Sequence, residues 1–420
     1  MGEQSEIISA AAEILTKRYG GEQQLVDVAR LDGSGLAGVF RARVVTNPFF
    51  QHRSVVVKYA PATGEELGDA AFLREVVAYQ FATSLPEHSR PGPVLLGYDT
   101  AQRILIVSDL GEGETLAEAL EAADEATHVE LLRTLGCALG KMHAGTANEE
   151  DAYNVLFQRM TRSRPNAVVV QRLRDRMLAH RIRLGVDFLR RAGIEIPTEV
   201  ALIAANVQSR LLRGGMRAFT PFDLAPDNII RGDGTFHFLD YEWAGFRDVS
   251  FDVAFVVARF PVFLAAQPFN PEATQAFIDA WVAEVGGIWS SVRHPDTLQA
   301  RITAALIGWA MSSVAMLEPF TAADVLASDA RLAKEFEDAG LTADDFSTEA
   351  ERAEATDGAT EFNGDVLRPH VEGPFTEDEL LVRRDLRETF ESLAAFAGTG
   401  ADPAYRQIAA FASGLAERLR

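Results

Sequence analysis

The stretch DLAPDN, residues 223–228, is followed twelve residues later by Asp240 in the stretch FLDYE, residues 238–242. The intervening sequence, residues 228–241, contains two short β-type runs on either side of a Gly-Asp-Gly turn, which predicts a hairpin. A hairpin of this length folds back and would bring Asp240 beside Asn228. Carboxylate and amide oxygens are the ligands that Mg²⁺ prefers. Taken alone, DLAPDN is equally typical of a polar loop with Asx turns, so the rest of the chain has to decide.

A lysine upstream fits the same site. Lys58 follows the apolar run Val55 to Val57, so a strand would hold its ammonium in a fixed place. A lysine so placed is a compact positive charge suited to phosphate groups. Glu75, in a predicted helix over residues 66–84, is a candidate carboxylate to orient it. The alternative for any single lysine is a solvated surface position.

A glycine-rich stretch precedes Lys58, with Gly33, Ser34, Gly35 and Gly38 in a G-x-G-x-x-G pattern. In dinucleotide-binding folds this pattern opens a helix. Here it is followed by the β-type run GVFRARVV, residues 38–45. A glycine-rich turn between two strands can donate backbone N–H groups to phosphates. An ordinary hairpin turn would have the same sequence, and the stretch alone does not separate the two.

Together these residues suit phosphoryl transfer, which asks a protein mainly for positioning and charge neutralisation. Asp223 would orient the attacking hydroxyl and take its proton as the catalytic residue. Asn228 and Asp240 would hold the metal, and Lys58, held by Glu75, would bind phosphates. The spacing of Asp223 and Asn228 is that of a kinase catalytic loop. Agreement of the glycines, the lysine and the two acidic motifs in order argues against a merely polar loop.

In motif order, residues 24–260 resemble the aminoglycoside phosphotransferase and choline kinase family, small-molecule relatives of the protein kinases. The resemblance implies ATP and Mg²⁺ as cofactors and an α+β, two-lobed protein-kinase-like fold, with a small β-rich N-lobe and a large, mostly helical C-lobe. It implies the same roles for Asp223, Asn228, Asp240, Lys58 and Glu75. Adenine would be bound by backbone groups of residues 108–110, namely Ser108, Asp109 and Leu110.

The chain departs from the family's pattern just before the catalytic loop. Relatives usually carry a histidine and a small or polar residue there, where this chain has Pro221 and Phe222. The substitution bears on loop geometry more than on chemistry. Asp252 matches a family position that is structural and would tie a helix to the catalytic loop.

Local patterns predict a helix over residues 5–19, three strands between residues 24 and 59, the helix over 66–84 and, after a loop near Gly97, a strand at 103–110. The expected lobes are residues 1–107 and 115–420, joined by a hinge at 108–114. The second lobe is predicted to be helical, interrupted only by the 228–241 hairpin. It ends with helices near 376–397 and 402–419. Residues 341–375, acidic and poor in large apolar groups, are predicted to be a mobile loop.

Composition limits the partners. The chain has 420 residues, and 61 acidic against 40 basic residues give a net charge of −21. Such a surface repels nucleic acids and anionic membranes and attracts cations, including amine-bearing small molecules. The apolar stretch 249–266 is broken by charges and a proline and would not span a bilayer. With no secretory signal in its first residues and Cys137 as its only cysteine, the protein is expected to be cytoplasmic.

The expected activity is transfer of the ATP γ-phosphate to a hydroxyl of a small molecule such as an amino sugar, an aminoglycoside-like compound or an amino alcohol. The alternative is a non-catalytic nucleotide-binding regulatory protein in which Pro221 and Phe222 distort the loop. Protein-kinase activity fits less well, because the sequence lacks D-F-G and A-P-E motifs. His143, at the end of an apolar helix, is expected to be a core residue with satisfied hydrogen bonds rather than a base.

Overall fold

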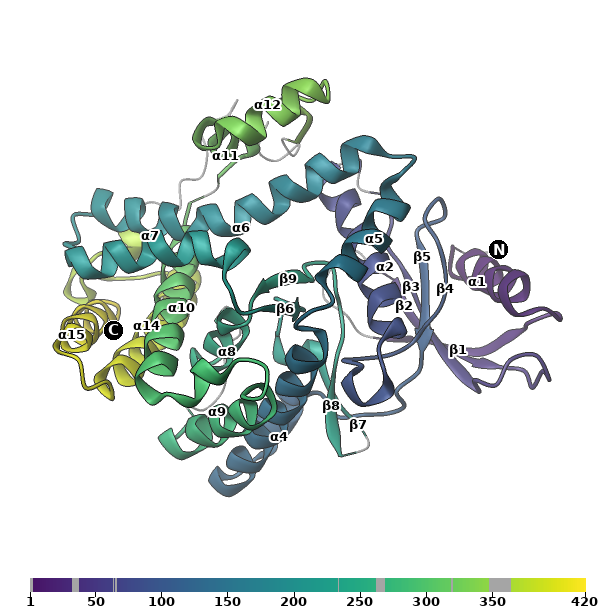
Figure 1. The fold of residues 1–420 in the computed structure, drawn as a ribbon, viewed down its shortest axis with the longest axis horizontal. Helices are drawn as coiled ribbons and strands as arrows, with labels where there is room; N and C mark the ends of the chain where they lie inside the picture. The colour runs from purple at the N-terminus through teal and green to yellow at the C-terminus, as the bar shows by residue number, and fades with distance from the viewer. Residues whose placement is uncertain are drawn as a thin grey trace.

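The computed structural model describes residues 3–31, 38–62, 64, 66–232, 234–261, 269–318, 320–346 and 364–420. The chain forms a small lobe built on a sheet and a larger, mostly helical lobe, at opposite ends of the molecule (Figure 1). The expected α+β, two-lobed arrangement is therefore confirmed.

The small lobe is a five-stranded antiparallel sheet in the order β1-β2-β3-β5-β4. Its elements are α1 (Glu3–Tyr19), β1 (Leu25–Leu31), β2 (Gly38–Val44), β3 (Ser54–Tyr59), α2 (Glu66–Ser84), β4 (Leu95–Asp99) and β5 (Ile104–Ser108). Side chains alternate between the two faces of a strand. Val55 and Val57 pack with α1 on one face, so Lys58 points to the opposite face, where α2 lies.

β4 was missed in the sequence, where its glycine was interpreted as part of a loop. Gly97 lies within the strand, and a Cβ there would come within 2.9 Å of the Ile14 side chain on α1. A glycine inside a strand often marks such a close approach. Here it lets α1 pack tightly against the sheet.

The larger lobe contains most of the helices. Its regular elements are α3 (Leu116–Ala122), α4 (Glu125–Thr146), α5 (Glu150–Thr161), α6 (Pro165–Arg191), α7 (Thr198–Arg213), β6 (Arg217–Thr220), β7 (Ile229–Gly232), β8 (Thr235–Phe238), β9 (Gly245–Asp248), α8 (Ser250–Val257), α9 (Pro271–Val285), α10 (Pro295–Ala315), α11 (Ala322–Ser328), α12 (Ala330–Asp338), α14 (Glu377–Gly398) and α15 (Pro403–Arg418). The predicted hairpin is confirmed as β7–β8, and both C-terminal helices are confirmed.

A second two-stranded pairing, β6 with β9, was not predicted. The two strands have four residues each and enclose the loop that begins at residue 221 and the β7–β8 hairpin. Pairing Thr220 with Gly245 brings the start of that loop next to the chain that leaves Asp240.

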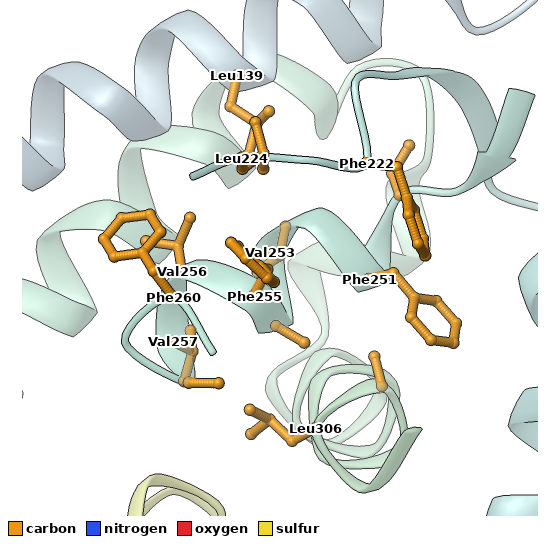
Figure 2. Packing of buried hydrophobic residues seen from close by; sticks show 14 of the residues in the cluster. Leu139, Phe222, Leu224, Phe251, Val253, Phe255, Val256, Val257, Phe260 and Leu306 are labelled. Carbon is orange, nitrogen blue, oxygen red and sulfur yellow. The ribbon is translucent and has the colours of Figure 1, made fainter. Parts of the chain in front are cut away.

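The core of the larger lobe lies under the same loop. Figure 2 shows Leu224 beside Leu139 of α4, and Phe222 beside Phe251 of α8. Leu224 and Leu139 are fully buried. The loop is thus fixed by apolar side chains on both sides of Asp223.

Within the segment 341–375, the described ends form short 3₁₀ turns, and Phe346, Val366 and Leu367 are buried. Residues 347–363 lie outside the described part of the chain. Among the helices of the described residues, none has the length and apolarity required to cross a membrane.

Candidate active site

Three charged side chains from distant parts of the chain meet between the lobes. The Nζ of Lys58 donates to Oε1 of Glu75 and to Oδ1 of Asp240, each at 2.8 Å. Lys58 comes from β3, Glu75 from α2, and Asp240 from the segment after β8. The Glu75 side chain is 3% exposed and that of Asp240 is 35% exposed, so the cluster is buried on the α2 side and open on the other.

The charges of this cluster do not cancel. Burial acts to lower the pKa of Lys58, but Glu75 and Asp240 more than offset it, and the pKa lies above its ordinary value. Burial raises the pKa of Glu75 to about 7, against the opposing effect of Lys58. When Glu75 is ionised, two carboxylates face one ammonium and leave a negative charge that a divalent cation would neutralise.

Asp223 lies on a loop with an unusual backbone. The preceding residue, Phe222, has a φ of 67°, a backbone conformation that residues other than glycine seldom adopt. Its buried ring lies 5.2 Å from that of Trp309, and the guanidinium of Arg247 is 4.8 Å from the ring centre. Phe222 therefore anchors the loop in the core.

Among the described residues, the Asp223 carboxyl has few hydrogen-bond partners. Its Oδ1 accepts a single long hydrogen bond of 3.3 Å from the N–H of Ala225. Burial raises the pKa of Asp223 to about 6, and the nearby charges of Asp240 and Glu242 act in the same direction. A carboxylate with a pKa close to neutrality is suited to accept a proton from a bound hydroxyl.

Asn228 lies next to the segment that carries Asp240. Its carbonyl accepts from the N–H of Leu239 at 2.8 Å, at the end of the β7–β8 hairpin that lies away from the turn. Among the described residues, none forms a hydrogen bond with its side chain. Lys58 contacts one Asp240 oxygen and leaves the carboxylate partly exposed. One amide and one carboxylate fit Mg²⁺, which commonly takes few protein ligands together with substrate phosphates.

The predicted hinge connects β5 to α3. The N–H of Ser108 donates to Val94, and its Oγ accepts from the N–H of Val94, so both groups are engaged within the sheet. Asp109 forms an ion pair of 3.1 Å with Arg41 of β2 and accepts from the N–H of Gly111 at 2.9 Å. Leu110 follows within the same turn. Arg41 also donates to the carbonyl of Gly111 at 2.7 Å and so ties the sheet to the hinge.

Within the glycine-rich stretch 33–38, the structure describes Gly38. Gly33, Ser34 and Gly35 lie outside the described residues. Gly38 begins β2 and is paired with Tyr59, the residue after Lys58. The stretch therefore leads into the strand adjacent to that of Lys58.

Sequence reasoning missed two residues beside the site. Glu242 contributes negative charge to Asp223 and Glu75, and its own pKa is raised by burial and by Asp240. Arg174 of α6 donates to the carbonyl of Glu242 at 3.1 Å and stacks on Trp243, 4.2 Å from the ring centre. Glu242 could have been suspected from its place two residues after Asp240. Arg174 is 68 residues away in sequence, and no local pattern marks it.

Three aromatic residues that follow Asp240 in sequence pack against other side chains of the protein. Phe246 packs against Tyr153 and Phe81, and Phe251 packs against Trp309. One face of Trp243 is covered by Arg174. Phe246 and Phe251 are therefore core residues.

His143 is a core residue, as expected. It is fully buried, accepts from the indole N–H of Trp281 at 3.0 Å, and lies 3.2 Å from Oδ2 of Asp252. Because its Nδ1 is the acceptor, the proton lies on Nε2 and is donated to Asp252. Asp252 thus joins α8 to α4. Among the described residues, none from the loop that carries Asp223 donates a hydrogen bond to it.

The chain is distantly similar to a number of solved structures. No family model matches the chain, and no curated protein matches it. Several solved structures do. They are kinases and phosphotransferases. A choline/ethanolamine kinase family protein from Mesorhizobium loti has 14% identity and a TM-score of 0.44 over 97% of this chain and 99% of its own. A macrolide 2'-phosphotransferase from Brachybacterium faecium has 17% identity and a TM-score of 0.44 over 79% of this chain and 96% of its own.

An ADP-bound aminoglycoside phosphotransferase has 13% identity and a TM-score of 0.43, and covers 76% of this chain and 97% of its own. Similarity as distant as this identifies neither the activity nor the substrate of the present chain.

Proposed function

We infer that the protein transfers the γ-phosphate of Mg·ATP to a hydroxyl group of a small molecule. The observation that carries this proposal is the meeting of Lys58 with Glu75 and Asp240, which lie 17 and 182 residues away in sequence. The three residues come from a strand, a helix and a loop, and the Asp240 carboxylate stays partly exposed. Perturbed groups gathered in this way are typical of functional sites.

Each residue would have one task. Lys58, oriented by Glu75, would bind phosphate oxygens. Asn228 and Asp240 would hold Mg²⁺, which would neutralise charge that develops on the transferred group. Asp223 would orient the acceptor hydroxyl and accept its proton, because its pKa of about 6 leaves it largely ionised at neutral pH.

The proposed acceptor carries an amine as well as a hydroxyl. Asp223, Asp240 and Glu242 lie close enough for their charges to influence one another. After Mg²⁺ has taken Asp240, Glu242 would remain as a negative charge able to attract an ammonium group. The chain's net charge of −21 would favour the approach of such a cation.

A phosphate-transfer screen tests the proposal. The purified protein would be incubated with labelled Mg·ATP and panels of amino sugars, amino alcohols and simple sugars. We expect labelled product from at least one amine-bearing alcohol. Asp240→Asn should lower that rate by about 10²-fold or more, because it removes a charge that acts on the transferred group. Asparagine also tolerates the φ of 55° at this position, so the fold should survive.

Asp227→Asn is the matched control. Asp227 is an exposed carboxylate in the same loop and should tolerate the change. Wild-type rates in Asp240→Asn would refute the assignment of the site. If Mg·ATP binds but no acceptor in the panels is phosphorylated, a non-catalytic nucleotide-binding role would be favoured instead.

A further inference from the structure

Two adjoining cavities lie outside the candidate active site. The first, of about 310 Å³, is bounded by α6, α7 and α12, and the second, of about 350 Å³, by α5, α6 and the β6–β9 pair. Neither is lined by Lys58, Asp223, Asn228 or Asp240. They share four lining residues, Arg172, Asp175, Arg217 and Phe246. We call the two together the arginine recess.

The charge of this recess is opposite to that of the whole molecule. Seven arginines and four carboxylates line it, a surplus of three positive charges in a chain whose net charge is −21. No lysine is among the lining residues. The seven arginines are Arg74, Arg172, Arg176, Arg213, Arg217, Arg247 and Arg331.

The carboxylates are already shared among these arginines. Asp175 accepts from Arg74 at 2.7 Å and from Arg247 at 2.8 Å through a single oxygen. Glu335 of α12 forms ion pairs with Arg172 at 2.6 Å and with Arg331 at 3.3 Å. The remaining pairs are Arg176 with Asp329 and Arg217 with Glu150.

Arg213 has no carboxylate partner within the described ranges. It lies in the last turn of α7 and is exposed. Its guanidinium, and the donors left over where two arginines share one carboxylate, are available to a ligand. Guanidinium groups present paired N–H donors that match phosphate and carboxylate oxygens.

We propose that the arginine recess binds a small polyanion that carries two or more phosphate or carboxylate groups. The chain's overall negative charge disfavours a long polyanion such as a nucleic acid, whereas a compact ligand enclosed by α6, α7 and α12 meets mainly arginines. Figure 1 shows α11 and α12 next to α6, where α12 carries Glu335 to the edge of the recess.

Isothermal titration calorimetry would test whether the arginine recess binds such a ligand. The probes are pyrophosphate, tripolyphosphate and citrate, with EDTA present to remove divalent cations. Wild-type protein should bind at least one probe. Arg213→Gln should raise the Kd for that probe by about tenfold or more. Arg213→Lys keeps the charge and should change this Kd less. Glu335→Gln should lower the Kd, because it releases Arg172 and Arg331 from their shared carboxylate.

Arg190→Gln is the control, since Arg190 is an exposed arginine on α6 outside the recess. Opposite effects of Arg213→Gln and Glu335→Gln cannot come from a general loss of structure. A probe bound at the candidate nucleotide site would be indifferent to both changes. Equal affinity in all variants, or no binding of any probe at millimolar concentration, would overturn the proposal. The experiment measures no turnover, so its result is independent of the proposed phosphotransferase activity.

Discussion

Phe222, which precedes Asp223, and Asp240 have positive φ angles of 67° and 55°. Such conformations cost free energy and persist only where the surrounding structure enforces them. Phe222 is held by Trp309 and Arg247, and Asp240 by Lys58. Because these contacts fix the backbone, the carboxylates of Asp223 and Asp240 are held in position by packed neighbours.

The pKa of Asp223 predicts how kcat/KM depends on pH. A general base must be unprotonated, so kcat/KM should rise by about tenfold per pH unit below pH 6 and become constant above it. Bound Mg²⁺ would shift this break to lower pH, because a cation favours the carboxylate form. Initial rates between pH 4.5 and 8, with circular dichroism to check folding, would measure it.

Glu242→Gln provides the matched variant. The charge of Glu242 raises the pKa of Asp223, so removing that charge should move the break in the pH profile to lower pH. A break above pH 7, or a profile unaffected by the substitution, would show that another group controls the rate.

At the level of helices and strands, a glycine lets α6 and α10 approach closely. A Cβ at Gly185 of α6 would overlap the carbonyl oxygen of Met311 on α10. Gly185→Ala should therefore destabilise the protein by about 2 kcal/mol or more, although alanine is the better helix former by about 1 kcal/mol. Urea unfolding would give the change in free energy.

Gly414 of α15 offers the opposite case. A Cβ there would meet no atom within 4 Å. Gly414→Ala should stabilise the protein by up to about 1 kcal/mol through helix propensity alone. If both substitutions had the same sign, packing between α6 and α10 would not be the cause of the first effect.

The elements also show what the sequence could predict. β3, α2 and the β7–β8 hairpin have local patterns, and they carry Lys58, Glu75, Asn228 and Asp240. β7 and β8 are equally short, but they flank a Gly-Asp-Gly turn that marks a hairpin. β4, β6 and β9 have no such turn and become strands through their partners. Arg174 and the ring stacking of Phe222 depend on helices far away in sequence, and a single sequence has no signal for such contacts.

For the whole molecule, the candidate site is divided between the lobes. Lys58 and Glu75 belong to the smaller lobe, and Asp223, Asn228 and Asp240 to the larger one. A ligand that binds both lobes only in the folded state stabilises it by about 2.7 kcal/mol at a concentration one hundred times its Kd. We therefore expect Mg·ATP to raise the melting temperature by a few degrees, as measured by differential scanning fluorimetry.

The increase should be smaller in EDTA and in Asp240→Asn, because both remove the metal that joins the nucleotide to the larger lobe. Asp227→Asn should respond like the wild type. An unchanged melting temperature at millimolar Mg·ATP would contradict nucleotide binding between the lobes.

The anchoring of Phe222 has one more consequence for the molecule. Trp309 is one of four tryptophans; its ring faces Phe222, and its indole N–H donates to the carbonyl of Phe251 at 2.8 Å. The emission of an indole depends on its surroundings. Any rearrangement of the segment bearing Asp223 would thus alter the intrinsic fluorescence of the protein, which carries its own optical reporter and needs no attached dye.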